Sequence, residues 1–305
     1  MIHITEAQSG AAISHELAFE AVRRALIAAS LPESVIFPVV LGSASDPQNK
    51  FTVKSAADGS LTGLKVGSYF PTNDAADLPR HDSIILLFDQ AKGRIGAIVE
   101  AGKLNAYRTA AANAVATDAL AHSNAQTLAL FGTGHQASYE AQAIARIRSL
   151  TKVLVVGRNA DRTRSFVAQL RENGLPAEES QAETACRTAD IIVTATTATK
   201  PLFQAGWVRP GTHISSMGSD AIGKQELPPQ LFAQSRLFCD LPEQSARIGE
   251  FQHAESRTSL TAIGSALTEC TKGRRTTDEI TIFDSSGIAL QDLYIAEAII
   301  AATST

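Results

Sequence analysis

Cysteine is scarce in this sequence, with three residues among 305, at Cys186, Cys239 and Cys270. They lie far apart and form no C-x-x-C pair, which excludes the common zinc sites and a disulfide framework, so we expect no bound metal. The N-terminus also lacks the basic segment followed by an apolar segment that marks a secretory signal. An odd number of cysteines without such a signal predicts reduced, buried thiols and a cytoplasmic protein.

The sequence has no excess of positive charge and no long apolar run. Lys and Arg number 27 against 31 Asp and Glu, a formal net charge of -4, so electrostatics do not favour a nucleic-acid partner. No apolar stretch approaches the ~20 residues of a membrane span. Apolar residues make up 44% of the chain and charged residues 19%, which is typical of a globular protein. We therefore expect neither a nucleic-acid partner nor a membrane partner.

The first part of the chain has the pattern of an α+β unit. Residues 14–29 begin with a possible cap, Ser14, and continue with apolar residues at helical spacing. Residues 35–100 contain five strand-like segments, "SVIFPVVLG", "KFTVKSA", "TGLKVGSYF", "DSIILLFD" and "GRIGAIVEA", separated by turn sequences. This pattern predicts an antiparallel meander. Residues 104–121 are rich in alanine and predict a helix.

After residue 126 apolar strands alternate with helical segments, such as 136–149 and 161–173. Near-continuous apolar strands separated by helices indicate a parallel sheet that is covered on both faces. The sequence therefore predicts an α+β domain over 1–118 and a doubly wound α/β domain of the Rossmann type over 119–285. The last segment, within 286–305, predicts an amphipathic helix.

A glycine-rich turn, "GTGHQA", follows the first of these apolar strands and opens a helix. Gly132, Gly134 and Ala137 match the G-x-G-x-x-G/A pattern of dinucleotide-binding proteins, in the strand–turn–helix context that this pattern requires. The turn contains no lysine and no G-K-[ST] ending, so it is not a triphosphate-binding P-loop. We expect it to hold the pyrophosphate of a dinucleotide, although a purely structural turn is the alternative. The remaining candidate cofactor contacts in the turn are Thr133, His135 and Gln136.

At the end of the second strand, where NAD-binding proteins often place an acidic residue, the sequence reads "VVGRNADRT". Arg158 and Asn159 occupy that place, and Arg162 follows one helical turn later. Because an arginine pairs well with a 2′-phosphate, we expect NAD(P)H as the cofactor, with NADP slightly favoured over NAD. Two alternatives remain: Asp161 contacts the ribose of NAD, or Arg158 is only a solvated surface residue.

Three charged residues stand in unexpected places. Lys65 lies inside a strand-like segment, Arg108 begins an otherwise apolar helix, and Asp220 lies on a glycine-flanked turn just past a parallel strand. Ligands of open α/β sheets bind beyond the carboxyl ends of the strands, so the turn of Asp220 is well placed for a ligand. For each residue taken alone, a solvated or salt-bridged charge is the simpler explanation.

Together, the motifs "GLKVGSYFPTN", "RTAAANAVA", "GTGHQA", "SSMGSDAIGKQEL" and "IFDSSGIALQDL" resemble the ornithine cyclodeaminase/mu-crystallin family, in the family's order and over about residues 15–300. The resemblance implies a substrate-binding and dimerisation domain, to which the last helix returns, joined to a Rossmann domain that binds NAD(P). It also implies a homodimer.

The resemblance implies roles for particular residues. Lys65 and Arg108 match the residues that bind the substrate carboxylate, and Asp220 matches the catalytic aspartate beside the substrate nitrogen, with Lys65 also placed in the catalytic machinery. The residues that match cofactor-lining positions outside the glycine turn are Thr196, Thr197, Ser285 and Gly287.

Two departures argue against ornithine as the substrate. Val39 stands where the cyclodeaminase has an arginine, and Thr52 stands where it has a glutamate for the side-chain amine. Within the family the sequence looks most like members that reduce iminosuccinate to aspartate. Such a substrate has a second carboxylate, for which the candidate donors are His81, Ser83, Arg80 and Lys54.

One further stretch of that likeness, "EQSARIGEFQHA" (243–254), predicts either a hydrogen-bonded face closing over the cofactor or an exposed helix. Its polar residues at helical spacing are Gln244, Arg247, Glu250 and His253.

We therefore expect an NAD(P)H-dependent reductase of a small α-imino acid, which transfers hydride to the imine carbon. The alternatives are a cyclodeaminase-like lyase that recycles bound NAD, an amino-acid dehydrogenase or ketimine reductase, and a non-enzymatic binding protein. The presence of Lys65, Arg108 and Asp220 together argues against the last.

Overall fold

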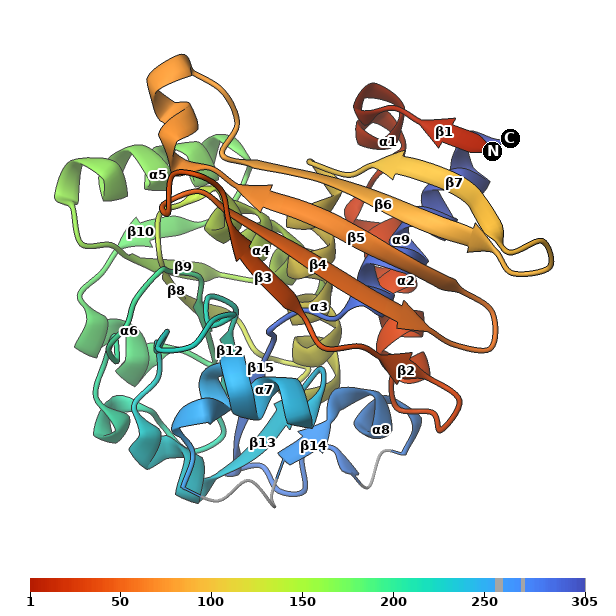
Figure 1. Cartoon of the computed structure of the whole chain (residues 1–305). Coiled ribbons are helices and arrows are strands. Elements are labelled where there is room, and N and C mark those ends of the chain that lie inside the picture. Colours follow the sequence, from red (N-terminus) through yellow and green to blue (C-terminus); the bar gives the residue numbers. More distant parts are fainter. Residues whose placement is uncertain (256–259, 270–271, 305) are drawn as a thin grey trace. The chain divides into compact units, whose positions relative to one another are not determined.

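The computed structural model describes residues 1–255, 260–269 and 272–304. The chain forms two compact units (Figure 1). Unit 1 comprises Met1–Arg108 and Ile288–Thr305, and unit 2 comprises Thr109–Gly287. The chain passes from unit 1 into unit 2 within the helix α3 (Leu104–Leu120) and returns after Gly287.

Unit 1 is built on a seven-stranded sheet with the order β1-β7-β6-β5-β4-β2, in which β3 also pairs with β4. The predicted meander is confirmed, because β4 to β7 pair antiparallel in chain order. The strands are β1 (Ile2–Ile4), β2 (Val35–Ile36), β3 (Val40–Ser43), β4 (Lys50–Ala57), β5 (Thr62–Tyr69), β6 (His81–Asp89) and β7 (Arg94–Glu100).

Two details of this sheet differ from the sequence prediction. The segment "SVIFPVVLG" forms two short strands, β2 and β3, rather than one, and Pro38 lies between them. Proline has no backbone N–H to donate to a neighbouring strand, so it interrupts the pairing. The edge strand β1 pairs parallel with β7, so the sheet is not purely antiparallel.

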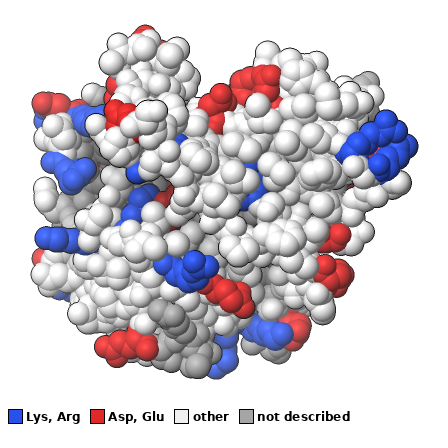
Figure 2. Space-filling model, viewed as in Figure 1, with Lys and Arg blue, Asp and Glu red and all other residues white. Residues whose placement is uncertain are grey.

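Helices of unit 1 lie on one side of its sheet (Figure 1). They are α1 (Glu6–Ala12), α2 (His15–Ala28) and α9 (Ala289–Thr303), and the short 3₁₀ helix η1 (Pro71–Ala76) precedes β6. The Ser14 side chain accepts a hydrogen bond from the Leu17 backbone N–H, which confirms the predicted cap of α2. The other side of the sheet faces the viewer in Figure 1, and that area of Figure 2 carries few charged side chains.

The prediction of an amphipathic last helix was wrong. Every residue of α9 from Ala289 to Ala296 is buried, because the helix packs against both α2 and the strands β4 to β6. A helix that is covered on all sides has no need of a polar face. Asp292, in the first turn of α9, is therefore a charge in the interior of unit 1.

Unit 2 is a doubly wound α/β unit, as predicted. Its eight strands are all parallel, in the order β10-β9-β8-β11-β12-β15-β13-β14. They are β8 (Thr127–Phe131), β9 (Lys152–Val156), β10 (Ala177–Glu179), β11 (Ile191–Thr194), β12 (His213–Ser216), β13 (Ser235–Cys239), β14 (Leu260–Ala262) and β15 (Ile280–Asp284). The strand order reverses between β8 and β11, and ligands of such sheets bind at this switch point.

The remaining elements of unit 2 connect these strands. The helices are α4 (His135–Ile147), α5 (Ala160–Glu172), α6 (Ala182–Thr188), α7 (Pro242–Ile248) and α8 (Ile263–Thr268), with the 3₁₀ helices η2 (Ala205–Trp207), η3 (Pro229–Gln234) and η4 (Glu250–His253). The central strands are buried along their length, which explains their near-continuous apolar sequences.

Cys186 and Cys239 are buried free thiols, and burial raises the pKa of Cys186 to about 12. Cys270 lies outside the described residues. Among the described residues, no helix combines the length and the apolar character that crossing a membrane requires.

Candidate active site

The glycine turn lies at the switch point of unit 2, between the end of β8 and the start of α4. Gly132 has φ +125°, and a Cβ there would lie 2.6 Å from the carbonyl oxygen of Ala195, so only glycine fits. A Cβ at Gly134 would meet no atom within 4 Å, and Gly134 provides α4 with no side-chain cap. Ala137 is completely buried. The space beside the Gly134 backbone is open, and the backbone N–H groups of the first turn of α4 have no side-chain cap. Both features fit a bound pyrophosphate.

Two side chains of the turn contact their own helix. The Gln136 Nε2 donates a hydrogen bond of 2.7 Å to Glu140, and the His135 ring lies 4.9 Å from the Tyr139 ring. Thr133 lies beside Gly157, where an added Cβ would be 2.8 Å from the Thr133 methyl group. Cofactor contacts of these three residues stay a prediction.

At the end of β9, Asn159 caps α5, and its Oδ1 accepts a 2.9 Å hydrogen bond from the Arg162 backbone N–H. Asp161 forms an ion pair with Arg164, and both side chains are exposed. Arg158 and Arg162 are exposed as well. The local structure thus explains Asn159 as a cap and leaves two exposed guanidinium groups next to the expected ribose position.

In unit 1, Lys65 and Arg108 converge on one carboxylate. The Lys65 Nζ lies 3.0 Å from Asp292 Oδ1 and donates to Asn105 Oδ1 at 2.6 Å. The Arg108 Nε lies 3.3 Å from the same Asp292 oxygen, and its Nη2 donates to Asn105 Oδ1 at 2.8 Å. Gln291 Oε1 accepts from Arg108 Nη1 at 3.4 Å. Strand β5, helix α3 and helix α9 therefore bring together a cluster that carries two positive charges and one negative charge.

Burial shapes the electrostatics of this cluster. Burial lowers the pKa of Lys65 to about 8, reinforced by the nearby charges of Arg108 and Lys54 and opposed by Asp292. Burial alone would raise the pKa of Asp292, but Lys65 and Arg108 hold it below its ordinary value. Asp292 Oδ2, Arg108 Nε and Gln291 Nε2 are buried without a hydrogen-bond partner among the described residues. A cluster with unsatisfied donors and an extra positive charge fits an anionic ligand such as a carboxylate.

The strand register places several candidate residues on the same sheet face as Lys65. Lys54 of β4 stands directly opposite Lys65, and Ser83 of β6 stands directly opposite Gly67. His81 stands opposite Tyr69. Because side chains two residues apart along a strand share a face, these residues line one surface with Lys65.

The candidates for the second carboxylate differ in their surroundings. Ser83 is buried, and its hydroxyl donates to the carbonyl oxygen of Ala101 at 2.9 Å. His81 is exposed, and its ring packs 4.7 Å from that of Tyr69. Arg80 forms an exposed ion pair with Asp74. The charge of Arg80 is thus matched by Asp74.

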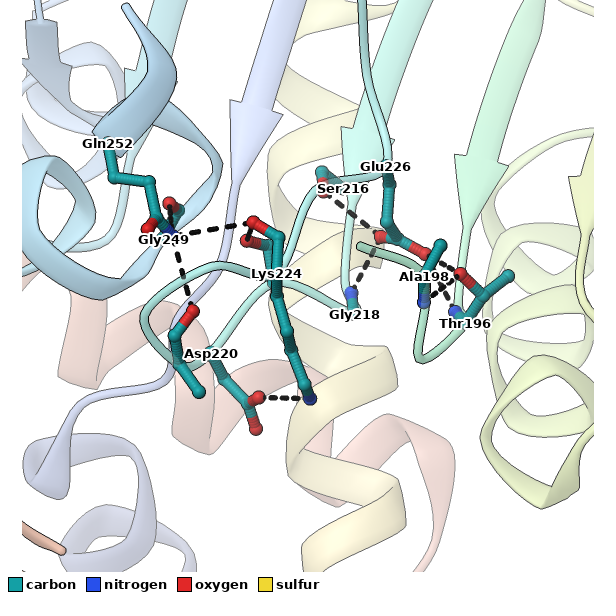
Figure 3. A network of polar contacts seen from close by, with 11 residues as sticks. Thr196, Ala198, Ser216, Gly218, Asp220, Lys224, Glu226, Gly249 and Gln252 are labelled. Carbon is teal, nitrogen blue, oxygen red and sulfur yellow. Dashed lines mark hydrogen bonds and ion pairs between the residues drawn. The ribbon is translucent and has the colours of Figure 1, made fainter. Parts of the chain in front are cut away.

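In unit 2, Asp220 lies in the loop that follows β12 (Figure 3). Its carboxylate forms an ion pair with Lys224, four residues further along the same loop. The side chain of Asp220 is 58% exposed, so a ligand has access to it. This placement agrees with the predicted turn past a parallel strand.

Residues of the stretch 243–254 form hydrogen bonds to the Asp220 loop. The residue with the most such bonds is Gln252, which the sequence analysis did not select. The Gln252 Oε1 accepts from the Gly223 N–H at 2.9 Å, and its Nε2 donates to the Ala221 carbonyl at 3.2 Å. The His253 ring contacts the Lys224 carbonyl oxygen at 2.8 Å. Arg247, by contrast, is exposed. Most of the stretch is a hydrogen-bonded scaffold rather than an exposed helix.

Two more predicted cofactor segments are fixed by buried carboxylates. Thr196 donates from its backbone N–H and from its hydroxyl to Glu226, both at 2.7 Å, while Thr197 is exposed. Asp240 accepts from the Ser285 hydroxyl at 3.1 Å and from the Gly287 N–H at 2.7 Å. Gly287 has φ +74°, which favours glycine. Both segments are therefore rigid parts of unit 2.

Sequence reasoning missed Asp292, Asn105, Glu226 and Gln252. Asp292 had a usable signal, because a carboxylate within the apolar run "GIALQDLYIAEAII" is as unusual as Lys65 within a strand. Asn105 and Gln252 are neutral polar residues in ordinary positions, and nothing in the sequence distinguishes them.

Comparisons with known proteins find relatives that match nearly the whole chain. The family model described as the ornithine cyclodeaminase/mu-crystallin family matches residues 5–304. Iminosuccinate reductase from Paracoccus denitrificans is 34% identical over 307 residues, which cover 98% of this chain and 96% of that relative.

Two solved structures extend this similarity. A crystal structure of the Paracoccus denitrificans iminosuccinate reductase in complex with NAD⁺ has a TM-score of 0.92 at 34% identity, covering 100% of this chain and 96% of that one. An archaeal alanine dehydrogenase dimer with bound NAD also has a TM-score of 0.92, at 28% identity, with the same coverage.

A pH dependence of stability follows from Glu250. Burial raises the pKa of this carboxyl group to about 7, with the nearby Glu226 adding to the effect. A carboxyl group with a raised pKa in the folded state favours folding below its unfolded pKa, and that contribution is lost as the pH rises through about 7. We expect the melting temperature of the wild type to fall, relative to that of Glu250→Gln, between about pH 5 and pH 8.

Differential scanning fluorimetry across this range measures the effect. The unfolding free energy of Glu250→Gln minus that of the wild type increases by roughly 2–3 kcal/mol between pH 5 and pH 8. Glu172→Gln, at an exposed site at the end of α5, serves as the control and keeps the wild-type pH dependence. Parallel curves for the wild type and Glu250→Gln would show that Glu250 titrates normally.

Proposed function

The chain belongs to the ornithine cyclodeaminase/mu-crystallin family, and on this premise we propose that it is an NAD(P)H-dependent reductase of a small α-imino acid, with iminosuccinate as substrate and aspartate as product. The observation that carries the proposal is the buried cluster of Lys65, Arg108 and Asp292, which fits a substrate carboxylate. The similarity to an iminosuccinate reductase over nearly the whole chain supports the choice of substrate.

Lys65 and Arg108 bind and orient the carboxylate next to the imine. Arg108 offers a planar guanidinium for two parallel hydrogen bonds, and Lys65 adds a compact charge. Asp292 and Asn105 hold both cations in place before the substrate arrives. A carboxylate fixed in this way limits the orientations of the adjacent carbon, and correct orientation contributes up to ~7–11 kcal/mol in ideal cases.

Asp220 acts at the substrate nitrogen. Its carboxylate stabilises the protonated imine, which accepts hydride more readily than the neutral imine, and it holds or returns the proton on the nitrogen. The ion pair with Lys224 shows that this carboxylate already binds a nitrogen cation. The nicotinamide supplies the hydride when it is bound. Reduction adds one hydride to carbon and one proton to nitrogen, giving the amine.

The proposed cofactor contacts come from four segments of unit 2. The glycine turn binds the pyrophosphate, the end of β9 contacts the adenosine ribose, and the segments after β11 and β15 line the rest of the cofactor. The residues in these roles are Gly132, Thr133, Gly134, His135, Gln136, Ala137, Arg158, Asn159, Arg162, Thr196, Thr197, Ser285 and Gly287.

The second carboxylate of iminosuccinate lies over Gly67 in this proposal. Lys54 and His81 share the sheet face of Lys65, and Gly67 leaves room between them because it has no side chain. A Cβ there would be 3.5 Å or more from its nearest neighbours. Ser83 lies on the same face and adds a hydroxyl oxygen.

A cyclodeaminase-like lyase is the alternative reaction in this family. Val39 and Thr52 offer neither the cation nor the carboxylate that ornithine would require. Amino-acid dehydrogenation is the reverse of the proposed reduction and uses the same groups.

A spectrophotometric panel tests the reaction. Oxaloacetate with ammonia, pyruvate with methylamine, and cyclic imino acids are each combined with NADH or NADPH, and absorbance at 340 nm is followed. We expect the oxaloacetate–ammonia mixture to consume the cofactor fastest, because only this substrate has two carboxylates.

Asp220→Asn lowers kcat/KM by ~10²–10⁴-fold, because a neutral amide cannot exchange the proton.

Cofactor binding to Asp220→Asn, measured by nicotinamide fluorescence, stays within a few-fold of the wild type. Asp278→Asn, at an exposed position elsewhere in unit 2, serves as the control and keeps full activity. Turnover by Asp220→Asn at the wild-type rate would contradict the assignment. Ammonia release from ornithine without a net change at 340 nm would identify the lyase instead.

We further propose that NADPH is preferred over NADH, because the exposed Arg158 and Arg162 flank the expected position of the 2′-phosphate. The double substitution of both arginines by alanine then raises KM for NADPH by at least ~10-fold, through loss of charged hydrogen bonds, and leaves KM for NADH within about twofold. Arg164→Ala, which only breaks the pair with Asp161, is the control. An equal effect on both cofactors would argue against a 2′-phosphate contact.

We also propose that the chain forms a homodimer through the sheet face of unit 1 opposite α2 and α9. Val40, Val53, Val66 and Ile84 are cross-strand neighbours there, and Val40, Val66 and Ile84 are 55%, 42% and 42% exposed. A contiguous exposed apolar row is typical of an interface, and this area of Figure 2 is largely uncharged. The archaeal alanine dehydrogenase structure is described as a dimer.

Light scattering after gel filtration tests this assembly. The wild type has about twice the chain mass of 32.2 kDa, and Val66→Glu, which buries a charge in the interface, has the mass of a single chain. Leu31→Glu, at an exposed apolar residue after α2, leaves the dimer intact. A wild type that elutes as a monomer at micromolar concentration would refute the proposal.

A cytoplasmic location is a proposal as well, supported by the buried free thiols Cys186 and Cys239.

A further inference from the structure

We propose that Glu226 is a positioning residue for the reaction, because its carboxylate joins the segment that carries Thr196 to the loop that carries Asp220. The inference rests on the proposed function, in which these two segments serve the cofactor and the substrate nitrogen. Glu226 itself is completely buried and is not offered as a contact to either ligand.

The carboxylate of Glu226 accepts five hydrogen bonds from the last residues of β11 and β12 and from the loops that follow them, and Figure 3 shows its contacts with Thr196, Ser216 and Gly218. Oε1 accepts from the Thr196 N–H and the Thr196 hydroxyl, both at 2.7 Å. Oε2 accepts from the Thr194 hydroxyl at 2.7 Å, the Gly218 N–H at 2.9 Å and the Ser216 hydroxyl at 3.1 Å. Each oxygen thus binds one backbone N–H from a different loop.

These loops need such a connection because of where they lie. Thr194 and Ser216 are paired residues at the ends of the neighbouring strands β11 and β12, after which regular sheet pairing stops. The two segments remain in contact, since a Cβ at Gly218 would lie 2.2 Å from the Thr196 carbonyl oxygen and 2.7 Å from Glu226 Oε1. The partly buried N–H groups of Thr196 and Gly218, just past the strand ends, need an acceptor, and Glu226 provides it.

The same side chain closes the Asp220 loop on itself. Gly218 stands two residues before Asp220, and Glu226 stands six residues after it, so the bond from the Gly218 N–H to Glu226 joins the two ends of the loop. Gln252 fills the loop by binding Gly223 and Ala221. A closed and filled loop has fewer conformations, which fixes the position of Asp220 relative to Thr196.

Glu250 fixes Glu226 in turn. Its carboxyl group accepts from the Glu226 N–H at 3.0 and 3.1 Å and from the Leu227 N–H at 2.8 Å. The Ser216 hydroxyl lies 3.1 Å from Glu226 and 3.2 Å from Glu250. A hydroxyl has one hydrogen to donate, so a protonated Glu250 donating to Ser216, which donates to Glu226, satisfies all three groups.

The choice of substitution separates this role from simple packing. Glu226→Gln preserves size and shape, but either orientation of its amide points an NH₂ group at a backbone N–H, of Thr196 or of Gly218. Glu226→Asp is one methylene shorter but keeps two acceptor oxygens. Positioning by hydrogen bonds therefore predicts that the aspartate variant is more active than the glutamine variant, whereas packing predicts the opposite order.

We expect Glu226→Gln to lower kcat by ~10–100-fold, with KM for the imine and cofactor affinity changing less than about threefold, since the ligand-binding groups remain. In hydrogen exchange, residues 195–199 and 216–224 lose protection together. Arg148→Met is the matched control, because Arg148 is also buried in unit 2 but binds Asp118 and His122 instead. It lowers stability without changing kcat or the exchange of these two segments.

The outcomes distinguish the two proposals. If the wild type reduces no imine, the proposed function fails, and hydrogen exchange still tests whether Glu226 joins the two segments. If the wild type is active and Glu226→Gln matches it in kcat, or exceeds Glu226→Asp, the positioning role is refuted while the function stands. Loss of protection in only one of the two segments would refute it equally.

Discussion

The interior of unit 1 depends on a carboxylate shared by two buried cations. An isolated charge in a protein interior costs several kcal/mol, and a shared counter-ion offsets that cost only when its geometry is good. Asp292 lies within 3.3 Å of both Lys65 and Arg108 and connects the last helix to β5 and to the start of α3. The arrangement stabilises the fold and leaves one positive charge in excess, which is the condition that a carboxylate ligand requires. Structure and proposed chemistry therefore use the same three side chains.

Much of this architecture follows from local patterns in the sequence. The parallel strands of unit 2 are apolar along their length, and Gly132 and Gly134 stand where a dinucleotide turn needs them, so both were predicted. Lys65 and Arg108 were found because a cation within an apolar segment is unusual. Their partner was not found, because Asp292 is 227 residues from Lys65 along the chain and only the folded topology joins them. The buried character of α9 was missed for the same reason, since its covering comes from α2 and from strands far away in sequence.

Within this family one fold holds different chemistry, so the reaction is decided by a few positions rather than by the scaffold. The Rossmann unit provides loops at the carboxyl ends of its strands, and buried carboxylates fix those loops: Glu226 after β11 and β12, and Asp240 after β15. The register of the unit 1 sheet determines which side chains share a face, and it sets Lys54 opposite Lys65.

The discontinuity of unit 1 has a consequence for biosynthesis. The chain leaves this unit at Arg108 and re-enters it at Ile288, so all of unit 2 is made before the last helix emerges from the ribosome. Until then the nascent protein contains Lys65 and Arg108 but not the aspartate that pairs with both, and burying either cation is unfavourable. The strands of the unit 1 sheet all precede unit 2, so the sheet remains without its covering helix α9 while unit 2 is made, and unit 1 is complete only after residue 292 has emerged.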